Sequence, residues 1–194
     1  MYLGKEMFQP VPDRKLAKQL FKATVGRVEV ETHSFCNRRC TYCPNIVGDR
    51  RGPNQRLDED LFLLVAKNLG EIDYDRNIVL NNYNEPLFDR IILERIAQMR
   101  EQAPGSKILI YTNGDYLNPD YIEELAEAGL SYLHISIHLK MAEKFSEVYA
   151  LNRLSEIAVR IGIPAQFSTI KSNEYIIARF PHRRLEIETR AINF

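Results

Sequence analysis

All three cysteines of this 194-residue chain lie close together, at Cys36, Cys40 and Cys43. Their odd number and local spacing exclude a disulfide framework, which joins cysteines from separate parts of a chain. They follow a β-branched run, residues 28–32, that predicts a strand. Clustered thiolates on a loop are soft ligands that suit iron–sulfur clusters or zinc. The loop therefore predicts a metal centre around which the rest of the chain is organised.

The number of cysteines bears on the kind of metal centre. A cubane cluster has four irons, so three thiolates leave one iron without a protein ligand, whereas electron carriers normally supply a fourth cysteine. The chain has no fourth cysteine. The alternative is structural zinc with His33 or another histidine as the fourth ligand, although such sites usually draw ligands from two separated loops. The sequence favours an iron–sulfur cluster.

The cysteine spacing, with Tyr42 directly before the last cysteine, resembles the cluster loop of the radical S-adenosylmethionine (SAM) superfamily. The lead-in, residues 31–37, is similar to the strand-to-loop junction of that family, and the resemblance runs from about Arg27 to the end of the chain. It implies a [4Fe–4S] cluster held by the three cysteines alone, with SAM chelating the remaining iron. It also implies an electron donor such as a flavodoxin or ferredoxin.

The resemblance further implies an enzyme. Reductive cleavage of SAM would release a 5′-deoxyadenosyl radical that abstracts hydrogen from a peptide or small-molecule substrate, with the hard chemistry supplied by the cofactor. Two other functions remain open. One is a non-catalytic module whose zinc or iron–sulfur centre is structural, and the other is a degenerate barrel that binds SAM without turning it over.

Apolar and polar residues alternate along the chain with the periods of strands and helices. Strands are expected at 27–32, 77–80, 107–111, 132–139, 164–170 and 185–189, and helices at 13–23, 61–69, 91–99, 119–128 and 142–161. The segment between the last two strands has room for about two helical turns. Alternating strands and helices imply βαβ units and a parallel sheet.

The length of the chain restricts the architecture. A closed eight-stranded barrel needs about 250 residues, and the sequence has no Gly-rich turn of the doubly wound nucleotide-binding kind. We therefore expect an α/β fold, a partial (βα)₆ TIM-like barrel with a short N-terminal helix, which the resemblance also implies. Residues 1–25 would form the helical extension and residues 26–194 the barrel.

Polar residues follow the expected strands, where a parallel barrel places its active site. Asn84 and Glu85 come after the second strand, where the family has a Gly-Gly-Glu-like motif that meets the amino group of SAM. This chain keeps Glu-Pro but has Asn82, Tyr83 and Asn84 where small glycines are usual. The alternative role for Glu85 is to cap the following helix.

Three further strand ends supply candidates. Asn113 lies in a Thr-Asn-Gly turn that looks like that of the family, although Asn-Gly is also an ordinary turn pair. His134, Ser136 and His138 share one face of the fourth strand; the resemblance brings Ser136 and its neighbour toward the ribose of SAM, whereas His134 suits a hydrogen-bonded interior position. The residues expected at the cofactor are, together, Tyr42, Asn84, Glu85, Asn113, Ser136, His138 and Ser168.

Composition and charge restrict the partners. The chain has no apolar run of about 18 residues, and the first residues lead us to expect no signal peptide. Clustered reduced cysteines suit the cytoplasm. Basic residues exceed acidic ones in residues 1–56, but they form no dedicated nucleic-acid surface. We expect a cytoplasmic protein that binds neither membrane nor nucleic acid.

A further expectation concerns what covers the C-terminal side of the expected barrel. One branch of the family carries a cysteine-rich C-terminal (SPASM-type) extension for auxiliary clusters, and this sequence does not include one. The last expected strand ends shortly before Phe194, and an open parallel sheet has edges that need covering. We expect a further C-terminal region or a partner chain to cover the open side.

Overall fold

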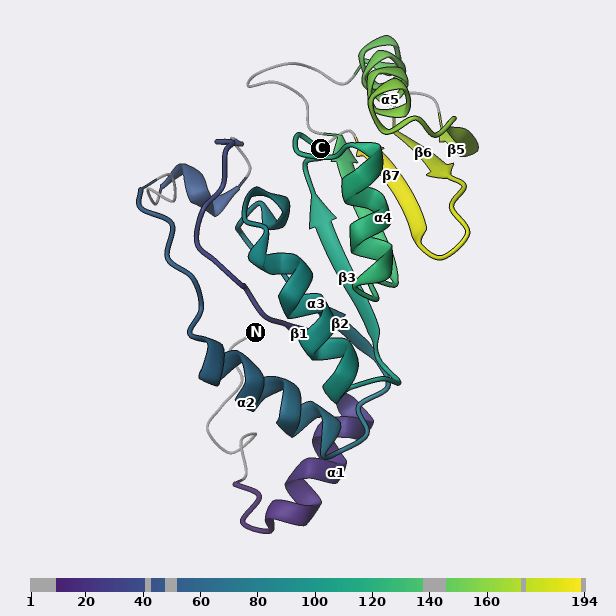
Figure 1. The fold of residues 1–194 in the computed structure, drawn as a ribbon. Helices are drawn as coiled ribbons and strands as arrows, with labels where there is room; N and C mark the ends of the chain where they lie inside the picture. Colours follow the sequence, from purple (N-terminus) through teal and green to yellow (C-terminus); the bar gives the residue numbers. More distant parts are fainter. Residues whose placement is uncertain (1–9, 41–42, 48–51, 138–145, 172–173, 193–194) are drawn as a thin grey trace, which may run out of the picture.

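The computed structural model describes residues 10–40, 43–47, 52–137, 146–171 and 174–192 (Figure 1). The strands are β1 (Arg27–Glu29), β2 (Asn77–Val79), β3 (Lys107–Thr112), β4 (Tyr132–Ile137), β5 (Gln166–Lys171), β6 (Tyr175–Phe180) and β7 (Glu186–Ile192). The helices are α1 (Arg14–Thr24), α2 (Glu59–Gly70), α3 (Ile91–Gln102), α4 (Pro119–Glu127) and α5 (Glu147–Ile161), with short 3₁₀ helices η2 (Pro44–Ile46) and η3 (Pro86–Phe88).

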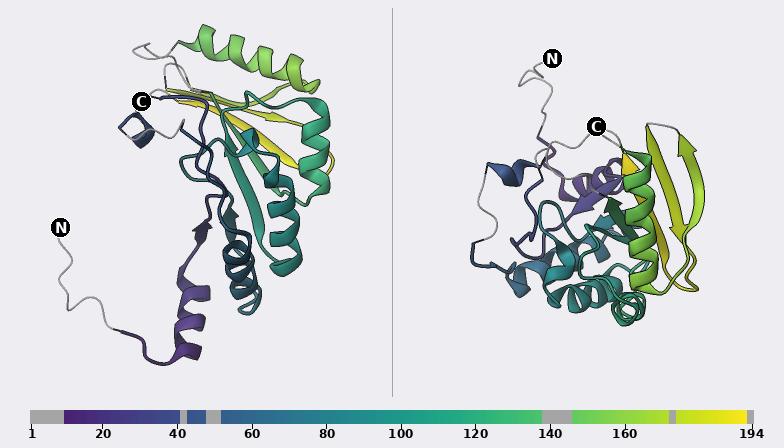
Figure 2. Two further views of the ribbon diagram at one scale, coloured as in Figure 1. Left: turned by 60° about the vertical axis from the view of Figure 1, so that its left-hand side comes forward. Right: turned by 90° about the horizontal axis from the view of Figure 1, so that it is seen from above.

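The strands form one sheet in the order β1-β2-β3-β4-β7-β6-β5. Neighbours from β1 to β4 pair in parallel, and β7 pairs in parallel with β4. Helices α2, α3, α4 and α5 pack side by side in sequence order and cover one face of the sheet (Figure 2). The carboxyl ends of five strands therefore meet at one edge of the sheet, as the predicted βα repeats require.

The C-terminal third differs from the prediction of six parallel strands. Residues 175–180 form a strand, β6, where about two helical turns were expected, and β6 is antiparallel to both β5 and β7. A parallel connection needs a dozen or more residues, whereas β5 ends at Lys171 and β6 begins at Tyr175. The short linker dictates an antiparallel pair, so this part of the prediction was wrong.

The hydrophobic core lies between the sheet and its helices. Ile108 and Ile110 of β3 and Leu133 and Ile135 of β4 are fully buried on the helix side. Side chains alternate along a strand, so Tyr111 lies on the opposite, polar face of the sheet. The same sequence alternation that builds the core thus leaves a polar face inside the curve of the sheet.

The predicted N-terminal helix is present as α1. Asp13 caps it, accepting hydrogen bonds from the backbone N–H groups of Lys15 and Leu16 at 2.8 and 3.2 Å. An ion pair of 2.6 Å between Lys18 and Glu71 ties α1 to the end of α2. Among the described residues, no helix combines the length and apolar character needed to cross a bilayer.

The end of α2 approaches the end of α3 at Gly70. A Cβ atom on Gly70 would lie 2.2 Å from the carbonyl oxygen of Gln102. We predict that Gly70→Ala lowers the free energy of unfolding by about 1–3 kcal/mol, because backbone must move to relieve the overlap. The control is Gly52→Ala, where a Cβ would have no heavy atom within 4 Å. Urea denaturation measures both, and an unchanged midpoint for Gly70→Ala would contradict the close approach.

Candidate functional site

A cavity of about 180 Å³ lies at the carboxyl ends of β2, β3 and β4. Its lining comes from the cysteine loop and from the residues that follow these strands: Cys36, Arg38, Cys40, Cys43, Asn81, Asn82, Tyr83, Asn84, Glu85, Tyr111, Thr112, Asn113 and Ser136. Parallel strands that end at one edge bring these segments together although they are far apart in sequence. The cavity is the candidate functional site.

The base of the cysteine loop is held by the returning chain. His33 and Arg56 form an isolated antiparallel bridge, and the Leu57 N–H donates to the Thr32 carbonyl at 3.0 Å. Arg56 also donates from Nε and a terminal nitrogen to both carboxylate oxygens of Asp89, at 2.7 and 2.8 Å. These bonds fix the start of the loop on the sheet edge.

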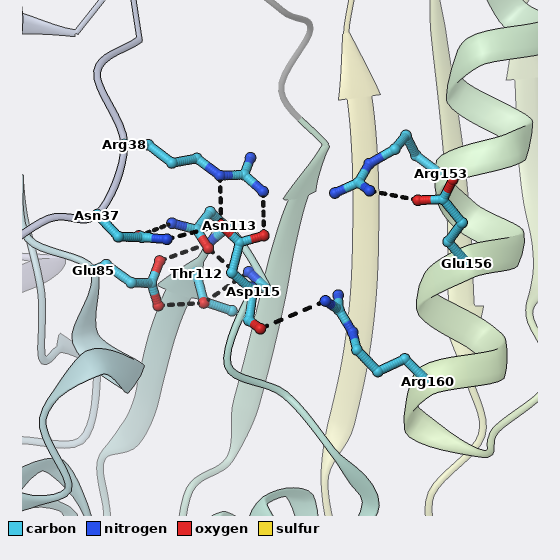
Figure 3. Close-up of polar contacts among 10 residues, drawn as sticks. Asn37, Arg38, Glu85, Thr112, Asn113, Asp115, Arg153, Glu156 and Arg160 are labelled. Atoms are coloured by element: carbon cyan, nitrogen blue, oxygen red, sulfur yellow. Dashed lines mark hydrogen bonds and ion pairs between the residues drawn. The ribbon is translucent and has the colours of Figure 1, made fainter.

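Glu85 is buried at the centre of the site, with 2% of its surface exposed (Figure 3). Its carboxylate accepts hydrogen bonds from Thr112 Oγ1 at 2.5 Å, from the Asn113 N–H at 2.8 Å and from the Leu87 N–H at 3.2 Å. Its own N–H donates to the Phe35 carbonyl at 2.9 Å. Glu85 therefore caps η3, as one alternative expected, and also lines the cavity.

Burial governs the protonation of this carboxyl. Removal from water raises the pKa of Glu85 to about 7, although the bonds from Thr112, Asn113 and Leu87 favour the anion. The group thus changes charge near neutral pH.

A second polar cluster joins the cysteine loop to the turn after β3 (Figure 3). Asn113 donates from Nδ2 to Asn37 Oδ1 at 2.7 Å, and its Oδ1 accepts from the Asp115 N–H at 2.9 Å. Asp115 in turn accepts from Asn37 Nδ2 at 2.9 Å and from two nitrogens of Arg38, the Nε contact being 2.8 Å. Burial disfavours the Asp115 charge, yet the Arg38 guanidinium holds the pKa of Asp115 below its usual range.

Asn84 contributes a buried donor to the site. Its backbone N–H donates to Glu31 Oε1 at 2.7 Å, and its Oδ1 accepts from the Asn82 N–H at 3.3 Å. The Nδ2 atom is buried and has no hydrogen-bond partner. An unpaired buried donor costs about 1–3 kcal/mol, so this side chain is suited to an acceptor atom of a ligand in the cavity.

Ser136 and His134 lie on the polar face of β4 at different depths. Ser136 lines the cavity. His134 is mostly buried below it, with Nδ1 3.3 Å from the Tyr132 hydroxyl, which itself donates to Glu188 at 3.1 Å. Burial lowers the pKa of His134 to about 4, so the ring is neutral at physiological pH. This placement matches the interior role considered for His134.

The structure brings together most of the residues that the sequence indicated. The three cysteines, Asn84, Glu85, Asn113 and Ser136 all line the cavity. Ser168 does not, because β6 and β7 separate its edge strand β5 from β4; its exposed hydroxyl donates to the Ile177 carbonyl at 3.2 Å. Tyr42 and His138 lie outside the described residues.

The three cysteines bring thiol groups to the cavity. All three are free and partly exposed, and burial raises the pKa of the Cys36 thiol. Within the described ranges, no group of three or more His, Cys, Asp or Glu is placed to ligate one metal ion. The unpaired Asn84 donor in the same cavity further fits a second ligand beside the cluster.

Comparison with known proteins agrees with this geometry. The family model described as "Radical SAM superfamily" matches residues 30–139, a range that holds the whole cavity lining. The chain is 33% identical over 122 residues to an S-adenosyl-L-methionine-dependent 2-deoxy-scyllo-inosamine dehydrogenase of Niallia circulans, covering 63% of this chain and 48% of that protein. It is 26% identical over 167 residues to a GTP 3′,8-cyclase of Alkaliphilus oremlandii, covering 81% of this chain and 51% of that protein. The chain thus spans about half the length of these curated relatives.

Solved structures show the same fold. The crystal structure of BtrN in complex with AdoMet and 2-DOIA matches with a TM-score of 0.55 and 27% identity, over 70% of this chain and 55% of BtrN. BtrN in an open conformation matches with a TM-score of 0.54 and 30% identity, over 60% of this chain and 51% of BtrN. The predicted fold class, an α/β partial TIM-like barrel, is confirmed.

The buried carboxyl predicts a pH-dependent stability. The pKa of Glu85 rises from 4.5 to about 7 on folding, so between these values the folded state holds more protons than the unfolded state. Stability from protonated Glu85 is present below pH 4.5 and is lost, by roughly 3 kcal/mol, as the pH rises to 7. The glutamine of Glu85→Gln cannot ionise, so this variant should not lose stability for this reason. The unfolding free energy of the variant minus that of the wild type should therefore rise between pH 4.5 and 7. Urea denaturation from pH 4.5 to 7.5 measures the difference, and parallel curves would refute it.

Proposed function

This chain belongs to the radical SAM superfamily, and we propose that it forms the cluster- and SAM-binding part of a radical SAM enzyme. Members of the family use a [4Fe–4S] cluster and SAM. The observation that supports the assignment is that Cys36, Cys40 and Cys43 share one cavity with Glu85 and Asn84 at the carboxyl ends of the parallel strands. Three thiols that share a cavity with Glu85 and Asn84 at the active-site edge of a parallel sheet favour a family enzyme over a structural zinc module.

The cysteines and the polar residues that resemble the family's motifs receive roles in this proposal. The three thiolates would hold the cluster, and when bound the cluster and SAM supply an electron for reductive cleavage and a radical for hydrogen abstraction from the substrate. Glu85, which lines the cavity and accepts from the Asn113 N–H through Oε2, would also accept from the amino group of SAM. Asn84 Nδ2 would donate to an oxygen of its methionine part.

The remaining candidates divide by their surroundings. The Ser136 hydroxyl lines the cavity and would contact the ribose of SAM. The Asn113 side chain is already bonded to Asn37 and Asp115, so its role is to shape the turn. Tyr42 and His138 stay predictions from the sequence, and the proposal does not include Ser168, which lies at the sheet edge.

The substrate we propose is a small organic molecule, not a peptide. The names of the two relatives refer to an aminocyclitol and a nucleotide.

An electron donor such as a flavodoxin or ferredoxin would reduce the cluster. Residues 26–194 would form the barrel and residues 1–25 an extension. Because the chain spans about half the length of these relatives, we propose that further substrate contacts come from outside it.

The ligand assignment predicts the fate of the iron. Cys36→Ala, Cys40→Ala and Cys43→Ala should each lose most of the iron after anaerobic reconstitution, because two thiolates do not hold a cubane firmly. Ser168→Ala, a control on the edge strand, should keep it. Iron analysis and the visible charge-transfer absorption measure the result. Stoichiometric zinc without iron in the wild type, or full iron in all three variants, would overturn the assignment.

The unpaired amide predicts an effect on SAM affinity. Asn84→Ala should keep the iron but raise the Kd for SAM about 10- to 100-fold, the scale for losing a hydrogen bond to a charged group. Calorimetry on the reconstituted protein measures the affinity, with Ser168→Ala as the matched control. Equal affinity in Asn84→Ala and wild type would remove Asn84 from the SAM site.

A further inference from the structure

One cation of the cysteine loop is held in a fixed position beside the thiols. Arg38 lies between Cys36 and Cys40 in sequence and lines the cavity with them. Its guanidinium donates to both oxygens of the Asp115 carboxylate (Figure 3). This planar, two-point contact fixes the direction of the guanidinium as well as its distance.

The carboxylate that receives Arg38 is itself well anchored. The Asp115 N–H donates to Asn113 Oδ1 at 2.9 Å, and Asn37 Nδ2 donates to Asp115 Oδ2 at 2.9 Å. From α5, Arg160 reaches the Asp115 carbonyl at 3.5 Å. The side chains of Arg38 and Asp115 are 23% and 29% exposed, so solvent screens their charges less than it screens an exposed pair.

We propose that Asp115 is a positioning residue that orients and neutralises the Arg38 guanidinium beside the cysteines, and so sets the electrostatic potential at the metal centre. The inference rests on the proposed function in taking that centre to be the cluster. A free cation next to the thiolates would favour the more negative, reduced cluster, whereas the neutral pair does so less. Asp115 therefore keeps the reduction potential of the cluster lower than an unpaired Arg38 would.

A second arginine–aspartate pair supports the cysteine loop without lining the cavity, so support of the loop does not by itself require a pair at the cavity. Arg56 and Asp89 make the same two-point contact at the base of the loop, at 2.7 and 2.8 Å. Neither residue lines the cavity, whereas Arg38 does. Of the two pairs, only Arg38–Asp115 therefore places a cation, neutralised by its carboxylate partner, at the cavity.

The first test measures local potential in the metal-free protein. Cys36 and Cys40 are alkylated with anionic iodoacetate or with neutral iodoacetamide, and mass spectrometry gives the rate at each cysteine. The ratio of the iodoacetate rate to the iodoacetamide rate reports the local charge, because a looser loop would speed both reagents equally. Asp115→Asn should raise the ratio about two- to threefold, as expected for one unit charge several ångströms away in water. Arg38→Gln should lower it, and the double variant should return it toward the wild-type value.

Two controls separate charge from fold. Glu124→Gln frees Arg90 from a pair between α3 and α4 that does not line the cavity, and should leave the ratio unchanged. Arg38→Lys keeps the cation and should keep a ratio near that of the wild type, which tests the inference even where Asp115→Asn folds poorly by circular dichroism. A ratio unchanged in Arg38→Gln, or shifted in the same direction by both single variants, would overturn the inference.

The second test measures the reduction potential of the reconstituted cluster. Asp115→Asn should shift it to less negative values, Arg38→Gln to more negative values, and the double variant should lie near the wild type. Shifts of one sign in both single variants would show a merely structural role. A wild-type protein that takes up no iron would defeat the proposed function, while the alkylation ratios would still decide the role of Asp115.

Discussion

The buried carboxylate of Glu85 is the contact on which the site depends. The carboxylate joins the loop after β2 to the end of β3 and its turn through Thr112 and Asn113, and the backbone N–H of Glu85 ties the same loop to the cysteine loop by donating to the Phe35 carbonyl. A carboxylate this deep is costly unless donors converge on it. The converging donors therefore fix the relative positions of the strand ends, and the cavity follows from that arrangement.

The electrostatics of the site follow from the same scaffold. Parallel strands deliver thiols, a buried carboxyl, an unpaired amide donor and a neutralised guanidinium to one small cavity. Two of these groups are held by neighbouring side chains: Thr112 donates to Glu85, and Asp115, which does not line the cavity, accepts from Arg38. In the proposed function, the protein would contribute this orientation and charge balance, because the cofactor supplies the reactive chemistry.

The sequence predicted what depends on local pattern. The cysteine spacing and the polar residues after the second and third strands were recognisable because periodicity places them at strand ends. The Arg38–Asp115 pair was not, because it joins residues 77 positions apart and no local pattern encodes it. Ser168 was misplaced for a related reason: the short linker before β6 reverses the chain, and β7, not β5, pairs with β4. Only the topology of the finished sheet reveals which strand lies beside the site.

Product analysis is the most direct test of the proposed radical chemistry. Anaerobically reconstituted protein, reduced with dithionite and given SAM, should form 5′-deoxyadenosine and methionine in equal amounts, and the Cys36→Ala variant should form neither. Chromatography of the quenched mixture measures both products. A fully iron-loaded wild-type protein that binds SAM and forms no 5′-deoxyadenosine would contradict the assignment of this cavity to a radical SAM enzyme.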